Sequence, residues 1–236
     1  MRTDTDLMIR ITERFGDTTP TSDGLAHERT LPPQNGTPIP FESFEVPAHI
    51  TTTQLSERLA QRSSSLAYDD KPIAAIRLFG LIQQALLRDA LDWGEISDVI
   101  PLEIYAFVLR PADVDPGVYH ITTAQYQRVA DLPSSDHWED LGVQREFAHA
   151  GAIVSAAGNL DQADSWAGTH GYRVLMGRAA STIYDIHLSS VAEGWVGTVF
   201  AGFIPSAVRV SLASDGASRQ QLFATTVAMP LTTRRR

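Results

Sequence analysis

Apolar residues recur at helical spacing in two long segments of the chain. Between residues 72 and 87 they form a wide stripe behind Pro72, a residue that suits the first turn of a helix. Between residues 172 and 192 a second stripe has the same spacing, and Gly194 follows it at the place of a left-handed C-cap. The pattern predicts a largely buried helix at each place, and a shorter helix over residues 54–61.

Other segments have the composition of strands. Residues 102–109 are apolar and rich in β-branched and aromatic residues, and the turn signal Asp115-Pro116-Gly117 separates them from residues 118–121, so a β-hairpin is expected. Residues 148–157 are small and apolar and fit a buried strand most simply, although a helix also fits. Further strands are expected at residues 195–203 and 222–229, and a loop at 133–136.

Composition narrows the class of protein. The chain has 236 residues, is 43% hydrophobic and carries a formal net charge of -9, which argues against binding to nucleic acid or to an anionic membrane. It contains no cysteine, and neither an apolar leader nor a membrane-spanning run is visible, so we expect a cytoplasmic protein. Residues 1–50 are rich in Thr, Pro, Asp and Gly and predict an extended arm, whereas residues 51–236 predict the folded domain.

Candidate chemistry begins at residues 61–68, where Arg62, Ser63 and Ser64 follow the short predicted helix. A guanidinium and neighbouring hydroxyls suit an anionic cofactor that is rich in hydrogen-bonding groups. A plain serine-rich loop or a helix cap explains the same run. The terminal triplet Arg234-Arg235-Arg236 offers donors for a phosphate, or is a solvated tail.

Several local motifs, in this order, resemble the nitroreductase family, and most closely its SagB-type branch, whose members oxidise azoline rings in ribosomally made peptides. The resemblance covers about residues 25 to 236. The motifs are His27-Glu28-Arg29-Thr30, the segment 41–50, Arg62-Ser63-Ser64 with Tyr68, Ser97 with Pro101-Leu102-Glu103-Ile104-Tyr105, Pro116-Gly117-Val118-Tyr119, Gly171-Tyr172-Arg173 and Gly202-Phe203.

The resemblance implies an α+β, nitroreductase-like fold: a central, mostly antiparallel sheet flanked by helices, in a dimer that holds FMN at its interface. It implies that residues 51–236 form an FMN-binding domain, in which Arg62 and Ser64, with Ser63 secondary, face the phosphate or the pyrimidine edge. Backbone N–H groups near Ala201 and Gly202 would approach the flavin N5. The remaining cofactor contacts implied are Ser97, Phe200, Arg234 and Arg235, the last two from either subunit.

The chain also departs from the SagB-type pattern. Leu66 stands where a basic residue is usual, and Trp166-Ala167 stands where azoline-oxidising relatives carry an adjacent Lys-Tyr pair. The candidate base is then His170, with Tyr172 as the nearest phenol, although a loop histidine and a core tyrosine fit these positions too. No metal site is expected, because His137 has no second histidine at ligand spacing.

Three functions follow from the resemblance and its departures. The first is an FMN-dependent oxidoreductase that tailors a ribosomally made peptide or a peptide-like natural product. The second is an NAD(P)H-dependent nitroreductase or flavin reductase. The third is a non-catalytic or half-site subunit that scaffolds a biosynthetic complex. The partners expected are a peptide or small-molecule substrate and a second subunit, either identical or related.

Overall fold

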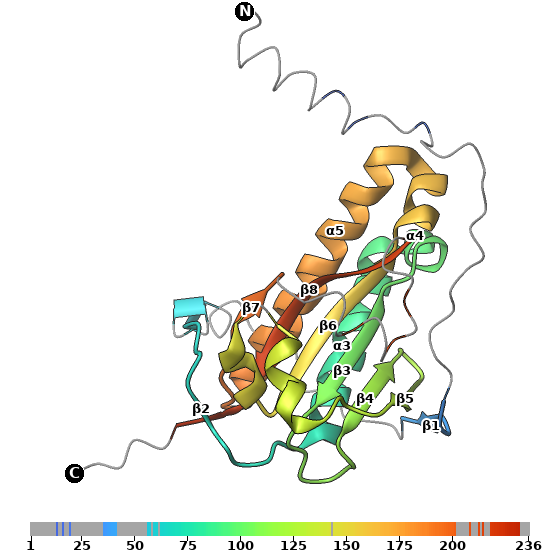
Figure 1. Ribbon diagram of the computed structural model, residues 1–236. Coiled ribbons are helices and arrows are strands. Elements are labelled where there is room, and N and C mark those ends of the chain that lie inside the picture. The colour runs from blue at the N-terminus through green and yellow to red at the C-terminus, as the bar shows by residue number, and fades with distance from the viewer. Residues whose placement is uncertain are drawn as a thin grey trace, which may run out of the picture.

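The fold was analysed in a computed structural model, which describes residues 35–41, 62–142, 144–201 and 218–231 (Figure 1). Ten single positions are described as well: 13, 16, 19, 56, 57, 59, 60, 208, 212 and 214. Positions 56, 57, 59 and 60 are helical, which agrees with the short helix predicted over residues 54–61.

A seven-stranded sheet forms the centre of the described structure, and all of its strand pairings are antiparallel. In sheet order the strands are β1 (Ile39–Pro40), β5 (Gln125–Ala130), β4 (Gly117–Ile121), β3 (Glu103–Val108), β6 (Ala152–Asn159), β8 (Arg219–Val227) and β7 (Val199–Phe200). A separate two-stranded sheet pairs β2 (Tyr68–Asp69) with β9 (Met229–Pro230). The hairpin predicted around Asp115-Pro116-Gly117 is confirmed as β3 and β4.

Two long helices cover one face of the sheet, and short helical turns lie on the other (Figure 1). The helices are α3 (Ala75–Trp93) and α5 (Leu160–Ala192), with the short α4 (Glu95–Val99) between α3 and β3; the 3₁₀ turns are η1 (Ser135–Asp140) and η2 (Arg145–His149). Strand β3 shows how the core is divided. Ile104 and Ala106 pack on the helical side, whereas Tyr105 and Phe107 pack on the side of Phe147.

Helix α5 is kinked near its start. Ala167 and Gly168 leave helical geometry, and Gly168 has a φ of 54°, which lies in the left-handed region. Just beyond the kink, a Cβ added to Gly171 would lie 1.9 Å from the carbonyl oxygen of Ala163. The kink therefore folds the first turns of α5 closely against its main part. At the other end Gly194 has a φ of 83°, which confirms the predicted left-handed C-cap position.

Several predicted boundaries are shifted, and each shift has a local cause. Helix α3 begins at Ala75 and not behind Pro72, because Ile73 forms a bridge with Pro111 and Asp113 accepts the free N–H groups of Ala75 (2.8 Å) and Ile76. The buried strand predicted from 148 begins only at 152, and the loop predicted at 133–136 continues into η1. Of the strand expected over residues 195–203, two residues form β7.

The edge of the sheet includes part of the predicted arm. Ile39 and Pro40 pair with β5, and Gln127 of β5 donates from its side-chain amide to the carbonyl oxygens of Asn35 (3.2 Å) and Gly36 (2.8 Å). Residues 35–41 are thus an extended segment that lies along the domain. The division at residue 50 remains a prediction.

Candidate functional site

The serine-rich run lies beside residues 195–201. We call this segment the strand after α5, and Val199–Phe200 of it form β7. The backbone N–H of Ser65 donates to the carbonyl oxygen of Gly197 at 2.9 Å. Directly after the run, β2 pairs with β9, which follows β8, so the middle and the end of the segment 62–69 are attached to the same part of the fold. Two stretches about 130 residues apart are therefore joined by main-chain hydrogen bonds.

Buried hydroxyl groups anchor this junction. The Tyr68 hydroxyl and Thr226 Oγ1 are 3.0 Å apart, and the backbone N–H of Thr198 donates to the same Oγ1 at 2.9 Å. Burial raises the pKa of Tyr68, so the phenol stays protonated at neutral pH. Thr226 thus links the segment 62–69 to β8 and to the strand after α5.

Arg62, Ser63 and Ser64 offer a set of donors at this junction. Arg62 is half-buried and forms no ion pair with any carboxylate of the described residues, while Ser63 and Ser64 are exposed. The positive charge of Arg62 acts on His187 of α5, whose pKa is lowered first by burial and then by this charge. A guanidinium without a carboxylate beside two free hydroxyls fits a phosphate, so the donors suit the anionic end of FMN.

The strand after α5 supplies the other predicted contacts. Phe200 stacks on Phe147 with ring centroids 4.0 Å apart, and Ala201 is exposed. At Gly197, a Cβ would lie 1.9 Å from the carbonyl oxygen of Thr226. At Gly197 the absence of a side chain thus allows the close approach of the β8 backbone. Gly202, Phe203, Arg234, Arg235 and the motif at residues 27–30 lie outside the described residues.

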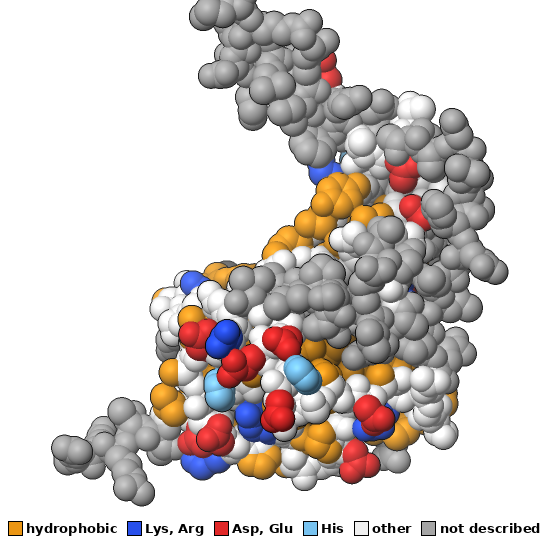
Figure 2. Space-filling view, viewed as in Figure 1, with side chains coloured by type: hydrophobic (Ala, Val, Ile, Leu, Met, Phe, Trp, Pro, Cys, Tyr) orange, Lys and Arg blue, Asp and Glu red, His pale blue; other side chains and the backbone are white. Residues whose placement is uncertain are grey.

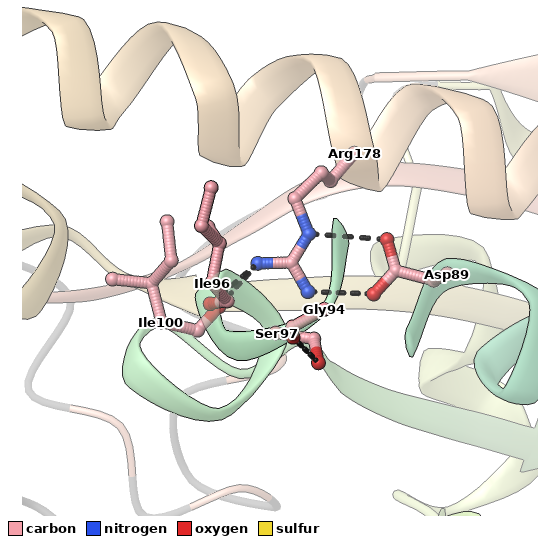
Figure 3. Close-up of polar contacts among 6 residues, drawn as sticks. All are labelled: Asp89, Gly94, Ile96, Ser97, Ile100 and Arg178. Atoms are coloured by element: carbon pink, nitrogen blue, oxygen red, sulfur yellow. Dashed lines mark hydrogen bonds and ion pairs between the residues drawn. The ribbon is translucent and has the colours of Figure 1, made fainter. Parts of the chain in front are cut away.

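Ser97 lies elsewhere in the chain. It is part of α4, where its hydroxyl donates to the carbonyl oxygen of Gly94 at 2.6 Å (Figure 3). In Figure 1, α4 lies near the kinked end of α5, whereas β2 and β7 lie near the opposite end. Within one chain, the structure does not bring Ser97 to Arg62.

A cavity of about 550 Å³ opens beside α4. Its polar lining includes Ser97 and six larger side chains: Asp89, Asp98, Glu103, His120, Gln162 and Arg178. Arg178 is fully buried and donates to both carboxylate oxygens of Asp89, at 3.0 and 2.6 Å (Figure 3). It also donates to the carbonyl oxygen of Ile100 at 2.7 Å, so one side chain ties α5 to α3 and to the end of α4.

The two candidate catalytic residues are also remote from Arg62. His170 is half-buried, with its ring centroid 6.1 Å from that of Trp166, and Tyr172 is 42% exposed. His170 lies 17 positions before His187 in the helix, which corresponds to about 25 Å along the axis. His187 is the α5 residue whose pKa is lowered by the charge of Arg62. The structure therefore places the predicted catalytic residues and Arg62 towards opposite ends of α5, with Ser97 at the catalytic end.

Sequence reasoning missed several residues that shape these regions. Thr226 lay inside a predicted strand and His187 inside a predicted helix. His187 is buried, at 1% exposure, and its Nδ1 lies 3.0 Å from Thr225 Oγ1. The cavity and its buried Arg178 carried no local signal, because its lining comes from segments scattered between residues 86 and 178.

Comparison with known proteins was informative at the level of structure. A scan of the sequence against protein-family models gave no match, and a search of curated proteins gave none either. Among solved structures, a protein of Anabaena variabilis assigned as a nitroreductase aligns with a TM-score of 0.68 and 16% identity. That alignment covers 89% of this chain but only 45% of the Anabaena protein, so this chain spans less than half of its length.

Two further structures align over nearly their whole length. A protein of Ralstonia eutropha, also assigned as a nitroreductase, has a TM-score of 0.57 and 16% identity, over 86% of this chain and 98% of its own. A chain of the E. coli microcin synthetase McbBCD complex with truncated pro-MccB17 bound has a TM-score of 0.58 and 15% identity, over 98% of this chain and 95% of its own.

The fold therefore belongs to the α+β class, with a mostly antiparallel sheet flanked by helices. More particularly, it is a nitroreductase-like fold, as the sequence motifs predicted. Among the described helices, none is both long and apolar enough to cross a membrane.

Proposed function

We propose that this protein is an FMN-dependent oxidoreductase that modifies a ribosomally made peptide or a peptide-like natural product. The observation that carries the proposal is the attachment of the run that bears Arg62, Ser63 and Ser64, through the backbone of Ser65, to the strand after α5 within a nitroreductase-like fold. In this proposal Arg62 and Ser64 hold the phosphate or the pyrimidine edge, with Ser63 beside them. Ala201, Gly202 and Phe200 lie along the ring system, and Arg234 or Arg235 completes the phosphate site.

The residues of the chain bind and orient, and the flavin would supply the redox chemistry by accepting a hydride at N5. Two features of the junction suit a binding role. Because Arg62 has no ion pair with a carboxylate of the described residues, no such pair must be broken before Arg62 binds an anion. Thr226 holds the segment 62–69 in place through the Tyr68 hydroxyl. Dehydrogenation also requires a group that takes up a proton, for which His170 and Tyr172 remain the candidates.

A dimer would reconcile the separation of these residues. If two chains pack with their α5 helices antiparallel around a two-fold axis near Ser181, the His170 end of one helix comes beside the Arg62 end of the other. The surface of α5 suits such a contact. Arg173, Gly177, Ser181 and Tyr184 are exposed on one side at helical spacing, and hydrophobic side chains gather along α5 where the surface is hollowed (Figure 2).

Two observations support a peptide substrate: one of the similar structures and the SagB-type motifs of the sequence. The microcin synthetase complex that aligns with this chain has a truncated pro-MccB17 bound, and the SagB-type motifs run in the same order along this sequence. An enone reductase of a gut-bacterial fatty acid metabolism also has this fold (TM-score 0.50, 11% identity), so the fold is compatible with other substrates.

A second candidate is a scaffold subunit without catalysis. Trp166 packs against the main core and Ala167 is buried at the kink, at the two places where azoline-oxidising relatives carry the Lys-Tyr pair. Neither residue can donate or accept a proton in the role of that pair. A scaffold would keep the fold and associate with a related, active subunit in a biosynthetic complex.

The absorbance spectrum of the purified protein tests the cofactor. We expect the flavin bands, and we expect Arg62→Ala to lose most of the bound flavin while its far-UV circular dichroism stays unchanged. Arg128→Ala is the matched control, because the Arg128 side chain is 40% exposed and lies on β5, near the opposite edge of the sheet from β8 and β7. A protein that stays colourless after reconstitution with FMN would rule out the flavin proposal and favour the scaffold.

Sedimentation velocity tests the dimer separately. The purified protein is expected to sediment as a dimer, and Ser181→Arg to shift it towards the monomer, because a long charged side chain would stand between the two helices. Asp136→Arg, at an exposed position of η1 on the other face of the sheet, serves as the control for a change of charge. A wild-type monomer at micromolar concentration would contradict the homodimer and leave a heterodimer with a related subunit to be tested by co-purification.

A further inference from the structure

The cavity beside α4 has a chemistry of its own. Its volume of about 550 Å³ lies within the range of pockets that bind small molecules or single side chains. Its walls come from α3, α4, the beginning of β3, the end of β4 and the start of α5. The lining side chains therefore come from both the helices and the sheet.

Most charged groups of the lining are already paired. Asp89 is engaged on both oxygens by Arg178, and Glu103 accepts hydrogen bonds from Tyr105 at 2.8 Å and from Arg219 at 2.5 Å. The Gln162 side-chain amide donates to the carbonyl oxygen of Val99 at 2.5 Å. These contacts fix the walls and cancel most of their charge.

Two groups of the lining remain available to a ligand. The Asp98 carboxylate is exposed, and among the described residues it has neither a hydrogen bond nor an ion pair. His120 stacks on Tyr105, with ring centroids 5.1 Å apart, but neither of its ring nitrogens has a hydrogen-bond partner in the described structure. The Asp98 carboxylate and an unprotonated ring nitrogen of His120 are therefore hydrogen-bond acceptors without a donor among the described residues.

The charge of the lining is negative. Burial lowers the pKa of His120, Glu103 opposes this effect and Arg219 adds to it, so the ring is neutral at pH 7. With Asp89 and Glu103 paired, Asp98 is the carboxylate of the lining that no cation of the described residues pairs with. The overall charge of -9 has the same sign. An anionic ligand is disfavoured here, whereas a cationic hydrogen-bond donor gains from both acceptors.

We propose that this cavity binds a primary ammonium group on a flexible chain, with Asp98 as its counter-ion and His120 as a neutral acceptor. The lysine side chain of a peptide, a peptide N-terminus and a free diamine share this chemistry. The buried Arg178 acts as a positioning residue, because it holds the end of α4, and therefore Asp98, against the core through the carbonyl oxygen of Ile100. Within one chain this site lies apart from the anion-accepting donors at Arg62, and the ammonium contacts proposed here involve only Asp98 and His120, not a flavin.

Isothermal titration calorimetry on the full-length protein tests the proposal. The first probe is Nα-acetyl-lysine N-methylamide, and its neutral counterpart is Nα-acetyl-norleucine N-methylamide, which has a similar length but no charge. We expect the lysine probe to bind about tenfold more tightly than the norleucine probe. Glycylglycine amide and 1,5-diaminopentane then show whether a peptide N-terminus or a free diamine is preferred, and tighter binding of either supports the ammonium site.

Matched variants locate the binding. Asp98→Asn removes the charge without changing the size of the side chain, and is expected to weaken the lysine probe about tenfold. His120→Phe keeps a ring stacked on Tyr105 and removes both nitrogens, so a smaller loss is expected. Asp136→Asn is the control, because Asp136 is an exposed carboxylate of η1 and does not line the cavity.

The binding experiment can succeed or fail independently of the flavin proposal. Binding of the lysine probe by colourless protein supports the cavity inference even when the flavin proposal fails. Equal binding of lysine and norleucine probes, equal effects of Asp98→Asn and Asp136→Asn, or no binding of any ammonium probe would overturn it. In a second readout, the His120 ring protons should shift in the NMR spectrum when the lysine probe is added, and their failure to move would also contradict the site.

Discussion

Arg178 and Asp89 form a two-pronged ion pair inside the protein, with N–O distances of 3.0 and 2.6 Å. The arginine side chain is fully buried and the aspartate side chain is 7% exposed. The same guanidinium donates to the carbonyl oxygen of Ile100 at the end of α4, and it reaches the carbonyl oxygen of Ile96, which also accepts the backbone N–H of Ile100. The pair therefore determines where α4 lies on the core.

Removal of one member of this pair should destabilise the protein strongly. For Arg178→Ala we expect a loss of about 3 to 5 kcal/mol in the free energy of unfolding, because the Asp89 carboxylate and the carbonyl oxygen of Ile100 would remain buried without the guanidinium that now donates to them. Arg88→Ala breaks the exposed Arg88–Asp185 pair and should cost about 1 kcal/mol or less. Urea denaturation followed by circular dichroism measures both. Similar losses in the two variants would show that the buried pair has no special role.

Two glycines of α5 should respond in opposite ways to the same substitution. Gly171→Ala places a Cβ 1.9 Å from the carbonyl oxygen of Ala163 and should destabilise the kink by about 1 to 3 kcal/mol. Gly177→Ala meets no atom within 4 Å and should stabilise the helix by about 0.5 to 1 kcal/mol. Thermal unfolding of the two variants under the same conditions gives the comparison. A stabilised Gly171→Ala protein would contradict the close contact across the kink.

The hydrophobic pattern was sufficient for most of the fold, because each predicted element buries residues at its own periodicity. The β3–β4 hairpin, the main part of α5 and the left-handed Gly194 follow from local sequence alone. The start of α3 does not, since the residue that caps it, Asp113, lies 38 positions further along the chain. The kink was missed as well, because a single glycine such as Gly168 does not by itself mark a kink, and the close contact of Gly171 with Ala163 is a tertiary relationship.

The candidate site was predictable only in part, for the same reason. The sequence indicated Arg62, Ser63, Ser64 and the strand after α5 as separate features, and their contact through Ser65 and Gly197 is a tertiary relationship. Neither the position of Ser97 beside the cavity nor the distance of His170 from Arg62 has a signature in the local sequence, because both depend on how α5 spans the sheet.

Thr226 should matter more to the junction than its partner Tyr68. Tyr68→Phe removes one hydroxyl and is expected to cost about 1 kcal/mol. Thr226→Val also leaves the buried N–H of Thr198 without its acceptor, so we expect a loss of about 2 to 3 kcal/mol. Amide hydrogen exchange provides the local readout, in which the Ser65 N–H should exchange faster in Thr226→Val. Unchanged exchange at Ser65 would mean that Thr226 does not hold the segment 62–69 in place.

The buried His187 should make the protein less stable in mild acid. Its folded-state pKa lies below the usual value of 6.5, because burial and the charge of Arg62 disfavour the protonated ring. Above pH 6.5 the ring is neutral in both the folded and the unfolded state, so it has no effect on the pH dependence of stability. As the pH falls below 6.5, the unfolded chain takes up a proton that the folded chain does not, and stability decreases.

His120 has a folded-state pKa shifted in the same direction, chiefly by burial, and should add to this decrease. The melting temperature is therefore expected to fall between pH 7.5 and pH 5, and to fall less steeply in His187→Gln than in the wild type. His149→Gln, which alters an exposed histidine of η2, should leave the slope unchanged. Differential scanning calorimetry across this pH range makes the measurement, and a His187→Gln slope as steep as that of the wild type would show that proton uptake by another group causes the loss.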